Sequence, residues 1–171
     1  MVIIKRILFV IGVILCLYPA IQYVAVQCDE QIEYIDEAMG QIHIPEIGIS
    51  LPIYYGTEEE ILEKGIGYIP WSSLPGGGES KHCLLAGHRG LPGAKLFTRL
   101  GEMKIGSRFF IEMDGQRLVY EVCEIQVIKP EQTENLGVQK GRDLVSLITC
   151  TPYGLNTHRL VVTGERMEED K

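Results

Sequence analysis

The chain has 171 residues and a formal net charge of −7. This acidic balance argues against a nucleic-acid-binding protein, because neutralising phosphate groups requires a basic face. With 46% hydrophobic and 23% charged residues, the composition is that of a folded protein with one main domain rather than a disordered chain.

An uncharged, apolar run from Ile7 to Val26 follows Lys5 and Arg6. As a helix rising about 1.5 Å per residue, the run spans about 30 Å, enough to cross the hydrocarbon core of a bilayer. The basic residues before it place the N-terminus in the cytoplasm. We therefore expect residues 1–26 to form a cytoplasmic tip and a single-pass cell-membrane anchor, with the rest of the chain extracellular. A cleaved signal peptide is the alternative, but its apolar region would be shorter, at about 7–15 residues.

The segment after the predicted anchor changes character twice. Residues 27–39 are polar and indicate a stalk or linker. Residues 40–166 contain seven or eight short β-like runs separated by turn residues, and Asp114-Gly115 between two of these runs is a strong hairpin signal. With little helix and no alternation of strand and helix, this domain is predicted to be an all-β barrel or sandwich. Residues 167–171 form a polar tail.

One short helix is expected among these strands. Thr57 is a good N-cap, and Glu60 three residues later would complete a capping box. The helix is predicted to continue through Lys64 and to end at Gly65. The acidic residues at its start are interpreted as a solvated first turn.

Three residues are candidates for chemistry, namely His88, Cys150 and Arg159. His88 and Cys150 each end an apolar strand and precede a turn, where a rigid scaffold can present a reactive group. Arg159 follows nine residues after Cys150, so a hairpin would return it to the side of the cysteine. The structural alternative is that the cysteine is a small buried hydrophobe and the histidine an ordinary core or surface residue.

These residue types suit acyl transfer. A free thiol has a pKa near 8.5, and a neighbouring cation favours the nucleophilic thiolate. Cys150 would form an acyl-enzyme, His88 would act as general acid and base, and Arg159 would hold the developing oxyanion or the substrate carbonyl.

The segment from Leu147 to Arg159 closely resembles the active-site signature of the sortases. In that family the nucleophile lies in a Thr-Leu-x-Thr-Cys run, and here Ser146 replaces the first threonine. The continuation Thr-Pro-Tyr-Gly-x-Asn-Thr-His-Arg is similar to class C, the pilin-polymerising group. The segment from Ala86 to Thr98 is similar to the sequence around the catalytic histidine of that class.

This resemblance implies an eight-stranded sortase-type β-barrel. It also implies a cysteine transpeptidase on the outer face of the cell membrane of a Gram-positive bacterium. Sortases cut a Leu-Pro-x-Thr-Gly-like sorting signal between Thr and Gly and pass the acyl group to an amine, which is a pilin lysine in class C. Carried over by motif, Cys150 is the nucleophile, His88 the acid and base, and Arg159 the oxyanion or carbonyl ligand. Thr149 would help to line the substrate groove, and no cofactor is implied.

Three other functions remain as alternatives. The acceptor amine could belong to a peptidoglycan cross-bridge, as in sortases that anchor proteins to the cell wall. Water could resolve the acyl-enzyme, as in a hydrolytic cysteine peptidase. The domain could also be a non-catalytic, membrane-tethered assembly subunit. A zinc site at His82 and Cys83 is not expected, because strand alternation directs the two side chains to opposite faces.

Overall fold

The computed structural model describes residues 18, 37–90, 96–132 and 136–167. By its contacts the chain divides into two units, Met1–Glu37 and Ala38–Lys171. The predicted anchor lies outside the described residues, apart from Tyr18. In the part of the chain that is described, no helix has the length and apolar character of a membrane span.

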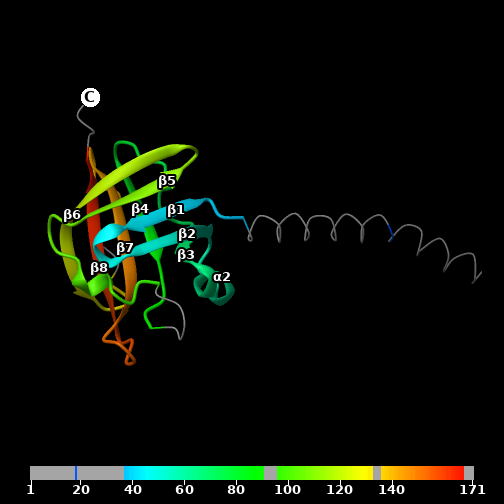
Figure 1. Ribbon diagram of the computed structural model, residues 1–171, viewed down its shortest axis with the longest axis vertical. Coiled ribbons are helices and arrows are strands. Elements are labelled where there is room, and N and C mark those ends of the chain that lie inside the picture. The colour runs from blue at the N-terminus through cyan, green and yellow to red at the C-terminus, as the bar shows by residue number, and fades with distance from the viewer. Residues whose placement is uncertain (1–17, 19–36, 91–95, 133–135, 168–171) are drawn as a thin grey trace, which may run out of the picture. The chain divides into compact units, whose positions relative to one another are not determined.

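The described strands of the second unit form a closed barrel of eight strands, with both antiparallel and parallel pairs (Figure 1). Around the barrel the order of neighbours is β1-β2-β3-β4-β7-β8-β6-β5. The predicted all-β barrel is therefore confirmed. The strands are β1 (Gly40–Ile44), β2 (Ile49–Tyr55), β3 (Ile66–Tyr68), β4 (Lys81–Ala86), β5 (Arg108–Met113), β6 (Gln116–Ile128), β7 (Asp143–Thr151) and β8 (His158–Arg166).

Three short helical segments accompany the strands: the α-helix α2 (Glu59–Lys64) and the 3-10 helices η1 (Pro45–Ile47) and η2 (Leu100–Glu102). The helix ends at Gly65 as predicted, where the Gly65 N–H donates to Ile61 O. The predicted Thr57 cap is wrong, because the N-cap residue is Glu58 and no side chain caps the helix. Just before the helix, the Gly56 N–H donates to Tyr68 O of β3 at 3.0 Å.

The predicted hairpin at Asp114-Gly115 is confirmed, since these two residues connect β5 to β6. Both have positive φ angles, 51° for Asp114 and 72° for Gly115. This is the backbone conformation that a two-residue type I′ turn requires, and aspartate and glycine adopt it most easily. The turn fixes the long β5–β6 ladder that closes one side of the barrel.

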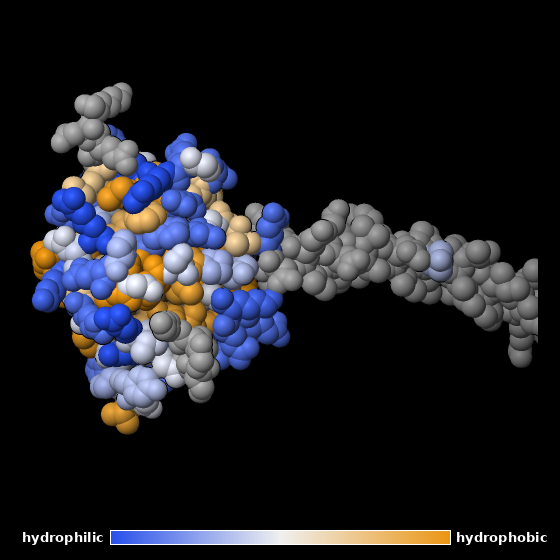
Figure 2. Space-filling model, viewed as in Figure 1, coloured by the Kyte–Doolittle hydropathy of each residue, from blue (hydrophilic) through white to orange (hydrophobic). Residues whose placement is uncertain are grey.

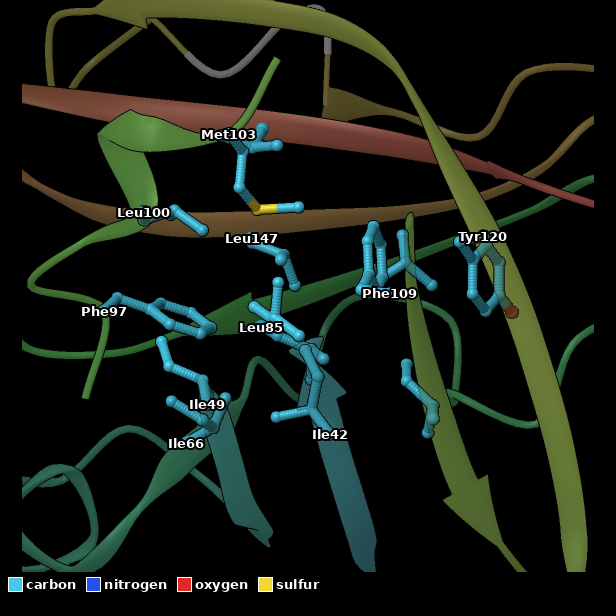
Figure 3. Packing of buried hydrophobic residues seen from close by; sticks show 14 of the residues in the cluster. Ile42, Ile49, Ile66, Leu85, Phe97, Leu100, Met103, Phe109, Tyr120 and Leu147 are labelled. Atoms are coloured by element: carbon cyan, nitrogen blue, oxygen red, sulfur yellow. The ribbon is translucent and has the colours of Figure 1, made fainter. Parts of the chain in front are cut away.

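Side chains that alternate along the strands fill the barrel interior. The core includes Leu85 of β4, Leu147 of β7 and Phe97 from the connection between β4 and β5, all fully buried (Figure 3). Burying a side chain of this size contributes about 1.5–3 kcal/mol. The core therefore holds β4 and β7 against each other from the inside.

The outer face of β4, β7 and β8 is also partly apolar. Leu84 of β4 and Val161 of β8 are completely buried there beneath Leu136, which lies in the connection from β6 to β7. Ile148 of β7 packs against the same cluster. On the face seen in Figure 2, hydrophobic residues are interspersed among hydrophilic ones. The outer face of β4, β7 and β8 thus carries a cluster of apolar side chains that is covered by the connection from β6 to β7.

Candidate active site

The parallel pairing of β4 with β7 brings two of the predicted site residues to one end of the barrel. The last paired residues are Ala86 and Ile148. The next residue, Gly87, donates its N–H to Ile148 O at 3.0 Å. Continuing this register places His88 beside Cys150. Parallel strands end at the same edge of a sheet, which is why two residues so distant in the sequence meet here.

The antiparallel pairing of β7 with β8 supplies the third residue. Cys150 and Arg159 are direct cross-strand partners. The prediction that a hairpin returns Arg159 to the side of Cys150 is therefore confirmed. Paired residues on neighbouring strands share one face of a sheet. His88, two residues beyond the end of β4, forms a row with Cys150 of β7 and Arg159 of β8, and all three are half-buried.

The row lies on the outer face of the barrel. Leu147 of β7 belongs to the interior core, whereas Ile148 packs on the outer cluster with Leu84 and Val161. Cys150 is two residues beyond Ile148 and shares its face because side chains alternate along a strand. The candidate reactive residues therefore lie on the same outer face as the apolar cluster of Leu84, Leu136 and Val161, next to it along the strands.

Thr149 lies on the opposite face of β7 from Cys150 and is buried. Its hydroxyl donates to Gly87 O at 2.7 Å. This bond links the end of β7 to the residue just before His88. In the structure the side chain of Thr149 therefore joins the two strand ends that present the row.

The Arg159 guanidinium is oriented by two backbone carbonyls. Its Nη1 donates to Asn156 O and to His158 O, each at 3.1 Å. Within the described residues, its Nη2 and Nε make no hydrogen bond. A guanidinium is always charged and offers its donors as a rigid fork. Arg159 thus retains donors for a carbonyl or oxyanion beside Cys150.

Arg89, which sequence reasoning did not single out, joins the two strand ends from the other side. Its Nη1 donates to Thr151 Oγ1 at 2.8 Å and to Cys150 O at 3.4 Å. Both contacts cross from the residue after His88 to the end of β7. Its position directly after His88 was the one sequence feature that could have marked Arg89 as part of the site.

Glu59 is a second residue that the sequence did not single out. Its Oε1 lies 3.2 Å from Nε2 of His88. The contact is at ion-pair distance, but its angles do not meet hydrogen-bond geometry, since Nε2 is buried without a hydrogen-bond partner. The start of the helix is solvated as interpreted, since 70% of the Glu59 side chain is exposed, and its contact with His88 is an addition that the sequence did not indicate.

A buried hydrogen-bond chain lies farther down the same outer face. His82 Nδ1 is 3.0 Å from Gly137 O, and its Nε2 is 2.8 Å from Ser146 Oγ. Because a carbonyl can only accept, Nδ1 bears the proton and Nε2 accepts from the Ser146 hydroxyl. Ser146 Oγ lies 2.7 Å from Thr163 Oγ1. Because the Ser146 hydroxyl donates its hydrogen to His82, it accepts a hydrogen bond from the Thr163 hydroxyl. Ser146, the position where the sequence departs from the sortase pattern, thus links three strands and the connection that contains Leu136.

The buried hydrogen bonds of His82 make the folding stability depend on pH. Burial lowers the pKa of His82, so the unfolded chain binds more protons than the folded one below about pH 6.5 and stability falls as the pH drops. His82→Gln should lose about 1–3 kcal/mol near neutral pH, because it disrupts buried hydrogen bonds. It should also reduce the difference in urea-unfolding free energy between about pH 7.5 and about pH 5.5.

The control for this prediction is His158→Gln, which changes a half-buried histidine bonded to Thr157. This variant should keep the pH dependence of the wild type. An unchanged pH dependence in His82→Gln would contradict the assigned role of His82.

The described cysteines differ in their surroundings. Cys83, Cys123 and Cys150 are all free. Burial strongly raises the pKa of Cys83, which belongs to the interior core, and also raises the pKa of Cys123. Both are therefore poor nucleophiles. The described residues contain no group of three His, Cys, Asp or Glu suited to a metal ion.

Comparison with known proteins agrees with this geometry. The sortase domain family matches residues 42–167. Sortase D of Bacillus subtilis is 29% identical over 134 residues, covering 77% of this chain and 65% of the relative. Sortase A of Streptococcus agalactiae is 30% identical over 130 residues, covering 74% of this chain and 52% of the relative. The chain thus spans between half and two thirds of the length of these curated relatives.

Solved structures of class C sortases match more closely. Sortase C-1 of Actinomyces oris is 52% identical with a TM-score of 0.77, covering 79% of this chain and 77% of that one. Sortase C1 of S. agalactiae, in complex with MTSET, is 48% identical with a TM-score of 0.77, covering 80% and 73%. Sortase C of Streptococcus pneumoniae is 43% identical with a TM-score of 0.77, covering 79% and 71%. The chain belongs to the sortase family, and its barrel is of the class C type.

Proposed function

We propose that this chain is a membrane-anchored, extracellular cysteine transpeptidase that polymerises pilins. It would cleave a Leu-Pro-x-Thr-Gly-like sorting signal between Thr and Gly and transfer the acyl group to a pilin lysine. The observation that supports this most is the row of His88, Cys150 and Arg159 at one end of the barrel. The row combines a nucleophile, an acid and base, and a fixed cation on one face.

In the first half-reaction, the Cys150 thiolate attacks the carbonyl carbon of the signal threonine. Charge develops on the carbonyl oxygen, and the free donors of Arg159 stabilise it. The bond from this carbon to the glycine nitrogen then breaks, and protonated His88 gives its proton to the leaving amine. A thioester on Cys150 and a glycine-terminated fragment result. Thr149 and Arg89 support this step by holding the strand ends together.

In the second half-reaction, the acceptor amine attacks the thioester carbonyl. His88 accepts a proton from the attacking nitrogen, and Arg159 again stabilises the oxyanion. The carbon–sulfur bond breaks, and its electron pair returns to Cys150 as a thiolate. The products are a new amide and a regenerated thiolate beside protonated His88, so the cycle uses no cofactor.

A pilin lysine is favoured as the acceptor by the structural likeness to class C enzymes. One similar structure, 49% identical, is the sortase C1 of a group B Streptococcus pilus island. The description of the S. pneumoniae enzyme refers to pilin substrate specificity. These statements concern those proteins, and they support the same substrate class here over a peptidoglycan amine.

The membrane placement rests on the apolar run from Ile7 to Val26 and on the basic residues before it. The full-length chain should therefore remain in the membrane fraction after a carbonate wash. Protease added to intact cells should remove the barrel. Release of the intact chain into the medium would instead indicate cleavage as a signal peptide.

The decisive test of the reaction uses full-length protein in mild detergent with a quenched Leu-Pro-x-Thr-Gly peptide. A lysine-containing pilin fragment or a peptidoglycan cross-bridge peptide is added as acceptor, and products are identified by mass spectrometry. An amide to the pilin lysine is expected. An amide to the cross-bridge peptide alone would indicate wall anchoring, and acid product alone would indicate a peptidase. No cleavage by a folded protein would favour the non-catalytic alternative.

A further inference from the structure

The side of His88 that faces helix α2 is in contact with an acidic residue. Glu59 is the first residue of α2, and its Oε1 lies 3.2 Å from His88 Nε2. The helix packs beside β2 and β3 (Figure 1) and is anchored by Ile61, which is only 2% exposed. The position of Glu59 is therefore set by the barrel, although its carboxylate is largely exposed.

The charged and titratable groups around His88 come from several elements. Cys150 of β7 lies beside it in the register, and Arg159 of β8 is the next residue in the row. Arg89 follows it in the chain and reaches the end of β7. Among the described residues, Glu59 is the only carboxylate at ion-pair distance from the ring.

We infer that Glu59 is a positioning residue for His88, an inference that rests on the proposed transpeptidase function. Its carboxylate engages Nε2, limits rotation of the ring and favours the imidazolium. Nδ1 is then the nitrogen that exchanges the proton with Cys150 and with the leaving and attacking amines. A nucleophile, a histidine and an orienting carboxylate form a common arrangement for activating a thiol or hydroxyl group.

The observed geometry is consistent with this role in a protein without substrate. The contact is short but not aligned as a hydrogen bond. Catalytic hydrogen bonds are often poorly aligned before substrate binds and tighten in the complex. Because the carboxylate is exposed, the pair should add little to folding stability. Removing the charge should therefore change the chemistry without unfolding the protein.

The test compares full-length Glu59→Gln, Glu59→Asp and the control Glu60→Gln. Glu60 is exposed on the same helical turn and makes no ion pair in the described part of the chain. The first readout is kcat and KM for peptide cleavage as a function of pH. The second is the rate of Cys150 alkylation by iodoacetamide as a function of pH, which needs no peptide substrate. Peptide mapping assigns each alkylated position, because the full-length chain also contains Cys16, Cys28, Cys83 and Cys123, and only modification of Cys150 is counted.

Glu59→Gln should lower kcat by roughly tenfold, a part of the 10²–10⁴-fold general acid–base contribution, with KM nearly unchanged. The loss of activity at high pH should begin at a lower pH, because the imidazolium loses its anionic partner. Alkylation of Cys150 should need a higher pH, because a neighbouring imidazolium favours the thiolate. Glu59→Asp should restore part of both effects, and Glu60→Gln should match the wild type.

Two outcomes separate this inference from the proposed function. If the wild type cleaves the peptide and Glu59→Gln keeps its kcat and both pH profiles, Glu59 has no positioning role and the transpeptidase function stands. If no peptide is cleaved by any variant, the transpeptidase function fails. The alkylation profile then decides the Glu59–His88 coupling alone, since a displaced profile supports it and an unchanged one overturns it.

Discussion

Replacing Cys150 with alanine should abolish peptide cleavage, with a loss in kcat of about 10⁴-fold or more, as for other enzymes that lose their nucleophile. The strand is already fixed by the buried neighbours Leu147 and Thr149, so the fold should persist. The measurement is cleavage of a quenched Leu-Pro-x-Thr-Gly peptide, with circular dichroism to verify the barrel.

The matched control is Cys123→Ala. Cys123 is a free and exposed cysteine on β6, and it contacts Arg142 rather than the row. This variant should retain the cleavage rate of the wild type. Equal losses in the two variants, or full activity of Cys150→Ala, would show that the row is not the reactive centre.

Replacing Arg159 with lysine should lower kcat by about 10²–10³-fold, the cost of removing one donor to a developing oxyanion. Lysine keeps the positive charge but loses the planar fork, which is held by Asn156 O and His158 O. If Arg159 acts mainly on the oxyanion, KM should change much less than kcat. Steady-state kinetics with the peptide measures both.

Arg108→Lys provides the comparison for Arg159→Lys. Arg108 is exposed on β5 and pairs with Glu121 at 3.0 Å. It should leave kcat unchanged, because this pair lies on strands outside the row. A purely raised KM in Arg159→Lys, with normal kcat, would contradict the oxyanion role and indicate ground-state binding instead.

The row was predictable from sequence because each of its members follows from local patterns. Apolar strands ending at His88 and Cys150 marked the strand ends, and the short return to Arg159 implied a hairpin. The β5–β6 turn was predictable for the same reason, since Asp114 and Gly115 suit positive φ angles. The motifs around Cys150 then indicated the family and hence the barrel.

The residues that support the row were not predictable in the same way. Glu59 meets His88 only because α2 packs beside the barrel, and the sequence gives no spacing rule for that contact. His82 and Ser146 are 64 positions apart and meet through parallel pairing, which a strand pattern does not specify. The helix starts one residue later than the Thr57 pattern predicted, with Glu58 as its N-cap, and such patterns place a helix end only to within one or two residues.

Trapping the acyl-enzyme is the sharpest test of whether Cys150 is the nucleophile. Full-length protein is mixed with a Leu-Pro-x-Thr-Gly peptide without an acceptor, quenched in acid and measured as intact protein by mass spectrometry. The expected result is an added mass equal to the fragment ending in threonine, located on Cys150, removed by hydroxylamine and absent in Cys150→Ala. Release of the glycine fragment by Cys150→Ala at the wild-type rate, or an adduct on another residue, would contradict it.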